Sequence, residues 1–278
     1  MNTKNTMTKK VLTTSCLIIF LIIMVFPLLD MLSASFMPSA DLSRIPPKII
    51  PSTPTFVNYL AAFTRQPIMK YLVNSFISTL MAVFLCITVG CTASYALTRT
   101  RIRFKRIFLM FVLAISLLPT ITLINPIYKM YSQLGLLNTH IGLALIVSVL
   151  DLPMTIWFLT AIFKSVPESI EESAELDGAN MFQMFVYILL PLLKAGIFSI
   201  SILVFIGAWN RFLLAQVLNQ FESHRTVVVG LTLYQTTHTI PFGVVAAAAM
   251  ITILPLLVMV LLFQKNILGG IMEGGVKE

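Results

Sequence analysis

The chain has 278 residues, of which 58% are hydrophobic and only 11% are charged, and its mean hydropathy is +0.93. A water-soluble protein cannot cover that much apolar surface with so few charged side chains. The composition therefore excludes soluble enzymes, disordered chains and secreted disulfide-rich domains, and it indicates an integral membrane protein.

The basic residues are placed to contact lipid head groups and not nucleic acid, and the cysteines are not spaced as metal ligands. Lys and Arg total 19 against 11 Asp and Glu, and the net charge is +8. The basic residues lie between apolar runs, where they would meet anionic lipid head groups. Cys16, Cys86 and Cys91 lie inside apolar segments, with no Cys-x-x-Cys or Cys/His spacing. We therefore expect the cysteines to be small apolar fillers, and we expect no metal site and no nucleic-acid partner.

Six apolar runs are long enough to cross a bilayer, whose apolar core is about 30 Å thick and takes roughly 20 helical residues. The runs cover residues 11–29, 71–98, 107–128, 141–163, 192–214 and 242–264. In the fifth run the true apolar stretch is residues 195–210, with Lys194 and Arg211 at its two ends. The first is longer than the apolar part of a usual signal peptide, and no clear cleavage site follows it, so we expect an uncleaved helix. The sequence therefore predicts an all-α integral membrane protein with six transmembrane helices.

The distribution of basic residues orients these helices. Six helices place both termini on one side of the membrane, and the segments on that side hold 12 of the 19 Lys and Arg residues. Because cytoplasmic loops are enriched in Lys and Arg, both termini are predicted to be cytoplasmic. We expect three parts: residues 1–70 with the N-terminal segment, the first helix and an outer loop; residues 71–265 with five helices; and a cytoplasmic tail at residues 266–278.

The predicted cytoplasmic loop between the fourth and fifth helices is acidic. Four glutamates recur at i, i+3, i+4 and i+7, so they share one face of a short helix: Glu168, Glu171, Glu172 and Glu175. Pro167 suits the first position of that helix, and carboxylates in its first turn favour the helix dipole. Spacing alone leaves two interpretations open: a solvated acidic face, or a surface that contacts a cytoplasmic partner.

A second short helix is predicted after a tight turn in the same loop. Gly178 supplies the C-terminal stop of the first helix, and Asn180 with Gln183 can cap the second. The second helix covers the apolar residues 181–190 and runs into Pro191. The loop is therefore predicted to be a helix, a turn and a helix lying at the membrane surface.

The sequence of this loop resembles the EAA loop of permease subunits in binding-protein-dependent ABC importers. That pattern is Glu-Ala-Ala, three residues, Gly, nine residues, then Ile-x-Leu-Pro. Residues 172–179 read Glu-Ser-Ala-Glu-Leu-Asp-Gly-Ala, and residues 188–191 read Ile-Leu-Leu-Pro. Ser173 stands where the first Ala is usual, which is a small change in volume. The specific part of the match is the spacing of Gly178 and Pro191.

The resemblance covers essentially the whole chain. Further segments are similar to the carbohydrate-uptake group, and more narrowly to its second permease, the maltose-type "G" subunit: Asn74-Ser75, Trp209-Asn210 with residues 212–215, residues 246–255, and residues 274–277. The final Glu278 departs from the family, which commonly has Gly there.

The resemblance implies a mechanism and a set of partners. The EAA loop would be a coupling helix that docks in a cleft of a cytoplasmic ABC ATPase dimer, whose closure on ATP switches the permease between inward and outward openings. The other partners would be a second permease and an extracytoplasmic binding protein, in a bacterial plasma membrane. The acidic face would meet basic groups on the ATPase, and Gly178 would permit close backbone approach. The residues expected to couple to the ATPase are Glu172, Ser173, Ala174, Asp177, Gly178, Ala179 and Pro191.

The chain lacks the motifs of an ATPase or a hydrolase. It contains no Gly-Lys dipeptide, and therefore no G-x-x-x-x-G-K-[ST] phosphate loop, and it contains neither HExxH nor Gly-x-Ser-x-Gly. We expect no catalytic residues and no bound cofactor, with ATP and Mg used by the separate ATPase.

Five polar or aromatic residues are candidates for the solute path: Asn74, Asn125, Asp151, Trp209 and Asn210. Asp151 lies near the middle of the fourth run, where a carboxylate is costly, so it is expected either to bond within the bundle or to line a polar path. No other ionisable residue is expected at that depth. The asparagines are either sugar-hydroxyl partners or packing contacts between helices. Trp209 is expected at the membrane interface, or against a sugar ring or the binding protein.

Two other functions are compatible with a polytopic membrane protein. A self-sufficient secondary transporter or channel is disfavoured by the short chain, the lack of an inverted repeat and the few intramembrane ionisable groups. A membrane-embedded enzyme would need facing carboxylates or histidines, but His140, His224 and His238 are all expected near the outer surface. The sugar stays open: mono-, di- and oligosaccharides, sugar alcohols and glycerol phosphates are all compatible with the sequence.

Overall fold

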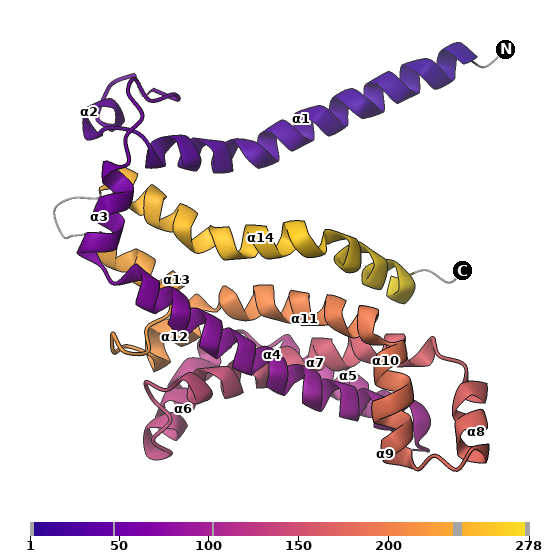
Figure 1. Cartoon of the computed structure of the whole chain (residues 1–278). Helices are drawn as coiled ribbons and strands as arrows, with labels where there is room; N and C mark the ends of the chain where they lie inside the picture. Colours follow the sequence, from indigo (N-terminus) through magenta and orange to yellow (C-terminus); the bar gives the residue numbers. More distant parts are fainter. Residues whose placement is uncertain (1–2, 47, 102, 236–240, 276–278) are drawn as a thin grey trace. The chain divides into compact units, whose positions relative to one another are not determined.

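The computed structural model describes residues 3–46, 48–101, 103–235 and 241–275, and within these ranges it contains helices and no strands. The predicted all-α class is confirmed (Figure 1). His238 lies outside the described residues. The chain divides into two compact units, Met1–Ile68 with Gly230–Leu254, and Met69–Val229 with Pro255–Glu278. The unit boundary after Ile68 lies two residues before the expected boundary after residue 70. The expected division into residues 1–70, 71–265 and 266–278 stays a prediction.

The first unit is built on polar contacts between short helices. Asn58 donates hydrogen bonds from Nδ2 to the carbonyls of Ser35, at 3.0 Å, and Met37, at 2.8 Å. A Cβ at Gly243 would come within 2.6 Å of the same amide, so only glycine permits this approach. The Tyr234 hydroxyl donates to the carbonyl of Ala62 at 2.6 Å. The elements of this unit are α1 (Thr3–Ser35), α2 (Ser39–Leu42), α3 (Val57–Arg65), the 3₁₀ helix η2 (Leu231–Tyr234) and the first part of α14 (Phe242–Gly275).

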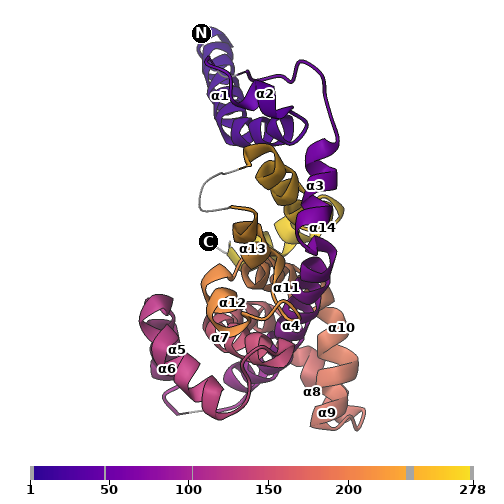
Figure 2. The same ribbon diagram turned by 90° about the vertical axis from the view of Figure 1, so that its left-hand side faces the viewer.

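The second unit is organised around α7, which packs against α4 and α11 (Figures 1 and 2). The Ser94 hydroxyl on α4 donates to the carbonyl of Ile156 on α7 at 3.1 Å. Gly196 on α11 faces Ile162 on α7, with space for little more than a hydrogen atom between them. The longer helices of this unit are α4 (Ile68–Arg99), α5 (Lys105–Ser116), α6 (Thr120–Gln133), α7 (His140–Lys164), α11 (Lys194–Trp209) and α12 (Phe212–Leu218).

The helices account for six membrane spans only if two of the spans are bent. Among the described residues, four helices are long and apolar enough to cross a bilayer: Leu12–Ser35, Ile68–Arg99, His140–Lys164 and Phe242–Gln264. Two further spans consist of bent pairs, Lys105–Ser116 with Thr120–Gln133 at 91°, and Met181–Leu192 with Lys194–Trp209 at 77°.

The third predicted run is therefore wrong as a single helix. It breaks before Pro119, because the residue that precedes a proline is disfavoured in the α conformation and helices commonly end there. The fifth helix is α11, which agrees within one residue at each end with the apolar stretch predicted at residues 195–210. α11 ends at Trp209, and the two residues that follow are not helical.

Candidate functional site

The first limb of the predicted coupling loop is α8 (Glu168–Leu176). Pro167 is the N-cap with extended backbone, one position earlier than expected, so the first helical residue is Glu168. Glu168 and Glu171 lie in the first turn, where the helix dipole favours carboxylates. Glu171 and Ala174 are the buried residues of this helix.

The turn after α8 confirms the predicted stop at Gly178. This residue has φ +87°, a backbone conformation that residues with a Cβ rarely adopt. Its N–H donates to the carbonyl of Glu175 at 3.0 Å, and the N–H of Ala179 donates to the carbonyl of Ala174 at 3.0 Å. These two bonds form a Schellman motif, which satisfies helix-end carbonyls that have no partner inside the helix.

The second limb begins as predicted and continues differently. Asn180 and Gln183 form a reciprocal capping box, each side chain accepting from the other's backbone N–H at 2.9 Å. The single α-helix predicted over residues 181–190 is wrong. The limb consists of α9 (Met181–Gln183), the π-helix η1 (Met184–Leu189) and α10 (Leu190–Leu192), and Pro191 lies inside this helical run. Because proline lacks the N–H of a regular α-helical bond, an uninterrupted α-helix cannot pass through Pro191 with all its bonds intact.

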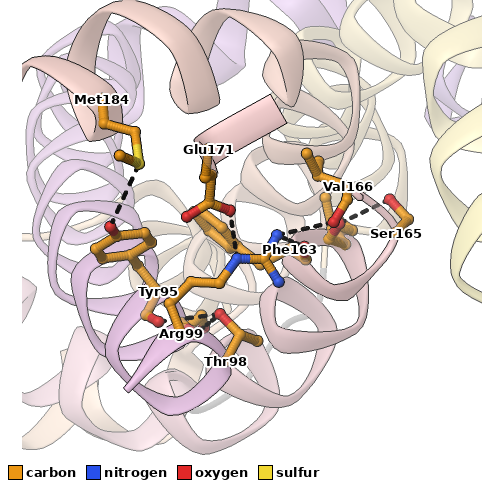
Figure 3. A network of polar contacts seen from close by, with 10 residues as sticks. Tyr95, Thr98, Arg99, Phe163, Ser165, Val166, Glu171 and Met184 are labelled. Atoms are coloured by element: carbon orange, nitrogen blue, oxygen red, sulfur yellow. Dashed lines mark hydrogen bonds and ion pairs between the residues drawn. The ribbon is translucent and has the colours of Figure 1, made fainter. Parts of the chain in front are cut away.

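The C-terminal end of α4 holds both limbs (Figure 3). The Tyr95 ring lies 5.1 Å from the ring of Phe185 on η1, and its hydroxyl is 4.0 Å from Sδ of Met184. One turn later, Nε of Arg99 donates to the carboxylate of Glu171 on α8. Tyr95 and Arg99 therefore fasten the second and the first limb, respectively, to the same end of α4.

Arg99 also contacts the end of α7. Its Nη2 donates to the carbonyl of Phe163 at 3.2 Å and to that of Val166 at 2.8 Å. The side chains of Arg99 and Glu171 are only 10% and 11% exposed. We call Arg99, Glu171 and these two carbonyls the Arg99 junction (Figure 3).

The Arg99 junction corrects the expected acidic face. Glu171 was expected to face a partner with the other glutamates, but it is buried and paired inside the chain. Glu168, Glu172 and Glu175 are exposed and line a cleft of about 330 Å³, together with Arg99 and neighbouring side chains. A partner can therefore reach three glutamates of this helix, not four.

Most residues predicted to couple to the ATPase gather around the Gly178 turn. Glu172, Ser173, Asp177 and Gly178 are exposed there. Three more complete the predicted set: buried Ala174, half-buried Ala179, and Pro191. Pro191 is not near the turn in sequence or in the helical run, since it lies beyond η1. The structure thus brings six of the seven together.

A buried polar cluster lies deeper in the second unit. Asp151 on α7 forms an ion pair with Arg211. No other ionisable residue was expected at the depth of Asp151, and this expectation is wrong. Arg211 lies just after the end of α11, between α11 and α12. α11 stops at Trp209, and the backbone of Asn210 and Arg211 leaves the helix, which turns the arginine toward α7.

This cluster contains polar atoms without partners. Within the described part of the chain, Oδ2 of Asp151, Nε of Arg211 and Nε1 of Trp209 are buried and make no hydrogen bond. A cavity of about 130 Å³ lies beside Asp151, between α7 and α11. A second cavity, of about 10 Å³, is lined by Trp209 and Arg211. Oδ2 of Asp151 can therefore accept, and the N–H groups of Arg211 and Trp209 can donate, further hydrogen bonds with water or a polar solute.

The other predicted path residues do not converge on this cluster. Asn74 is buried and donates to the carbonyl of Arg225 at 3.0 Å, which is a structural contact. Asn125 is exposed on α6, and Asn210 is exposed and donates to the carbonyl of Ile206 at 2.9 Å.

Trp209 is not an interfacial or exposed ring. It is only 2% exposed, and its ring lies 5.0 Å from that of Phe76 and 5.7 Å from that of Phe205. Packing between α4 and α11 buries the ring, because Trp209 is the last residue of α11 and faces α4.

Sequence reasoning missed Tyr95, Arg99 and Arg211. Arg99 is the first of five basic residues in the segment 99–106, and the positive-inside rule already explains all five. Nothing in the sequence therefore distinguished Arg99 from the other four. The usable signal for Arg211 was an acid in one apolar run and a base at the edge of another, since buried charges are normally paired.

A family model described as "Binding-protein-dependent transport system inner membrane component" matches residues 86–268, more than half of the chain. The chain belongs to this family. It is therefore a membrane permease of a transport system and not an enzyme, and a self-sufficient transporter or channel is not favoured.

Three curated relatives extend over nearly the whole chain. The sulfoquinovosyl glycerol transport system permease protein SmoH of Agrobacterium fabrum is 34% identical, covering 91% of this chain and 88% of that protein. The trehalose/maltose transport system permease protein MalG of Thermococcus litoralis is 32% identical, covering 97% of each. The trehalose transport system permease protein SugB of Mycobacterium tuberculosis is 34% identical, covering 90% and 92%.

One solved structure shares the fold. It is the crystal structure of a bacterial ABC transporter involved in the import of the acidic polysaccharide alginate. The matched chain has a TM-score of 0.80 and 22% sequence identity, with 95% of this chain and 98% of that chain covered.

Proposed function

We propose that this permease imports a sugar or a related polyol. It would form the translocation path together with a second permease and receive the solute from an extracytoplasmic binding protein. The support for the solute class is the relatives, whose names refer to sulfoquinovosyl glycerol, trehalose and maltose. A binding assay of mono-, di- and oligosaccharides on the cognate binding protein identifies the solute, and binding of amino acids or metal ions instead of sugars would remove this proposal.

We further propose that α8 and the Gly178 turn couple the permease to a separate ABC ATPase dimer, which uses ATP and Mg. The single observation that supports this role is the exposed Schellman turn at Gly178, where no atom of the described residues lies within 4 Å of a Cβ position. A partner backbone can approach such a turn closely. The exposed glutamates of α8, Glu168, Glu172 and Glu175, can pair with basic groups of the ATPase.

The proposed orientation places this turn and both termini in the cytoplasm. Arg99 is the last residue of α4, four more basic residues follow it up to residue 106, and Arg99 itself contacts α8. A dense basic segment is typical of the cytoplasmic side, so α8 belongs on the same side. Labelling of single cysteines placed on each side of the membrane tests this orientation.

Gly178→Asn tests the coupling role. Asn tolerates a left-handed backbone, so the turn is expected to persist while a side chain is added where the ATPase would approach. We expect sugar uptake to be lost while the protein inserts and assembles at its normal level.

Gly135→Asn is the matched control. Gly135 also has positive φ, +67°, with open space around its Cβ position, but it lies between α6 and α7. It should retain near-normal uptake. If Gly178→Asn also retained near-normal uptake, the Gly178 turn would have no coupling role.

A further inference from the structure

We propose that Arg99 is a positioning residue that makes α8 and the adjoining ends of α4 and α7 move as one body. The inference rests on the proposed coupling role of α8, because it concerns how a displacement of α8 reaches the membrane-spanning helices. It assigns a task to a residue outside the loop that contacts the ATPase.

The Arg99 junction joins three helices through one side chain. Arg99 is the last residue of α4, and its guanidinium meets the carboxylate of Glu171 on α8. The same guanidinium donates to the carbonyls of Phe163, in the last turn of α7, and of Val166, just after α7. The carbonyl of Phe163 also accepts from the N–H of Val166 at 3.3 Å, and its second lone pair serves Arg99. Carbonyls at and just beyond a helix end have few partners inside the helix, so they can accept such bonds. A guanidinium can serve three acceptors at once because its N–H groups form a rigid planar fork.

The attachment of α8 depends strongly on this junction. Glu171 and Ala174 are the only residues of α8 that are buried, all nine residues of the helix being described. Ala174 offers a single methyl group. Glu171 is therefore the one long side chain of α8 that the chain encloses, and its carboxylate is held by Arg99.

The surrounding charges strengthen this dependence. The cleft beside the Arg99 junction is lined by four glutamates and one arginine: Glu168, Glu171, Glu172, Glu175 and Arg99. Without the arginine, a buried carboxylate would remain among three exposed ones. Such a carboxylate is strongly driven toward water, and α8 would have to move outward to expose it.

The rest of the loop adds a second fixed point and leaves the tip free. Tyr95, one turn before Arg99, packs on Phe163 at 6.1 Å and on Phe185 of η1 at 5.1 Å. Leu176, at the end of α8, is 90% exposed. The two limbs are thus attached at their bases while the Gly178 turn projects. A force on the turn then reaches α4 and α7 through the Arg99 junction and not only through the three residues that link α7 to α8.

Spin labels at Leu176 on α8 and Phe84 on α4 test this inference. Both side chains are exposed, Phe84 by 69%. The sample is the full-length chain purified with its partner permease and ATPase in lipid nanodiscs, with and without Mg-ATP and vanadate. In the wild-type complex we expect one narrow distance distribution between the two labels in both conditions.

Arg99→Gln is expected to broaden that distribution or to shift it by about 2 Å or more, the scale of helix shifts in switching proteins. ATPase co-purification should stay within twofold, since the exposed residues of the Gly178 turn are untouched. In the wild-type complex, the spectrum of a single label at Phe84 should change when Mg-ATP and vanadate are added, and Arg99→Gln should abolish this change. A merely structural role would instead lower assembly and leave the nucleotide response of the assembled fraction intact.

Two further variants keep the test decisive. Glu171→Gln leaves the contacts of Arg99 with α7 and weakens only its link to α8, so it should also broaden the distance distribution. If Arg99→Gln does not assemble, Glu171→Gln decides the test alone. Arg101→Gln removes an exposed basic residue two positions further on and should behave as wild type. A wild-type distribution in both Arg99→Gln and Glu171→Gln overturns the inference.

The failure of the proposed coupling role is distinguishable from this result. A label at Leu176 alone should lose mobility when the ATPase binds. Unchanged mobility at that label would remove the docking role of α8, whatever the distance distributions show. Lost mobility together with unaltered distances in both variants would keep the docking role and remove the role of Arg99.

Discussion

The carboxylate of Asp151 on α7 is paired with the guanidinium of Arg211, which lies in the short break between α11 and α12. The two partners are not equally enclosed, because the side chain of Asp151 is 13% exposed and that of Arg211 is 32% exposed. The pair therefore holds the non-helical segment after α11 against the middle of α7. Because Asp151 is the more enclosed partner, neutralising Arg211 and neutralising Asp151 should change the stability of the protein by different amounts.

Arg211→Gln should destabilise the protein more than Asp151→Asn. The first leaves an enclosed carboxylate without a counter-charge, at a cost on the order of 3 to 5 kcal/mol, whereas the second leaves an arginine that reaches water more easily. The double variant should be more stable than Arg211→Gln alone, since it leaves no unpaired charge. Thermal unfolding in detergent measures all three, and additive effects of the two substitutions would contradict the ion pair.

Trp209→Ala should cost about 3 to 5 kcal/mol, because it removes a ring buried between Phe76 and Phe205. Trp157 is the other tryptophan of the chain and is 48% exposed, so Trp157→Ala should change stability far less. Tryptophan fluorescence gives a second readout. A lipid-soluble quencher should reduce the emission of Trp157 more than that of Trp209, and equal quenching would contradict the burial of Trp209.

Asn180→Ala should loosen the start of the second limb by about 1 kcal/mol, the usual effect of losing an N-cap. Gln183→Ala removes the reciprocal half of the same capping box. Because each substitution breaks part of one unit, the double variant should lose less than the sum of the two. Hydrogen exchange of the Gln183 amide follows the effect, and unaltered protection in Asn180→Ala would show that the box contributes nothing.

Asp41 provides a pH-dependent contact in the segment after α1. The backbone N–H of Ser52 donates to its carboxylate at 2.8 Å and, with the Ser52 hydroxyl and Lys48, lowers the pKa of Asp41 below its ordinary value of 3.8. Stabilisation by this contact is therefore complete above pH about 4. It is lost as the pH falls through the lowered pKa of Asp41.

Asp41→Asn should reproduce the acid effect at neutral pH. Trypsin cleavage at the exposed Arg44, three residues away, should be faster in this variant than in the wild type at pH 7. Equal cleavage rates would show that the carboxylate does not hold this segment.

The features predicted correctly from the sequence are local. The stop at Gly178 depends on the backbone freedom of one residue, and the capping box at Asn180 and Gln183 depends on a spacing of three. Both are properties of neighbouring residues, so a single sequence contains the whole signal. The apolar runs are local in the same sense, and they gave the class of the protein and the positions of its long helices.

The features that were missed depend on residues far apart in the chain. Arg99 and Glu171 are separated by 72 positions, and Asp151 and Arg211 by 60. Composition marks these residues as charged but does not select their partners. Without the pairing, Glu171 was assigned to an exposed acidic face, and no other ionisable residue was expected at the depth of Asp151.

The right-angle bend between α5 and α6 has a consequence for the assembled membrane protein. Where a helix stops, several carbonyl and N–H groups have no partner inside the helix, and lipid tails offer them none. The break at Leu117–Pro119 must therefore face water, head groups or another polypeptide, even though α5 has no buried residue in this chain. The bend thus marks a place on the surface of this chain where the hydrocarbon of the bilayer is kept away.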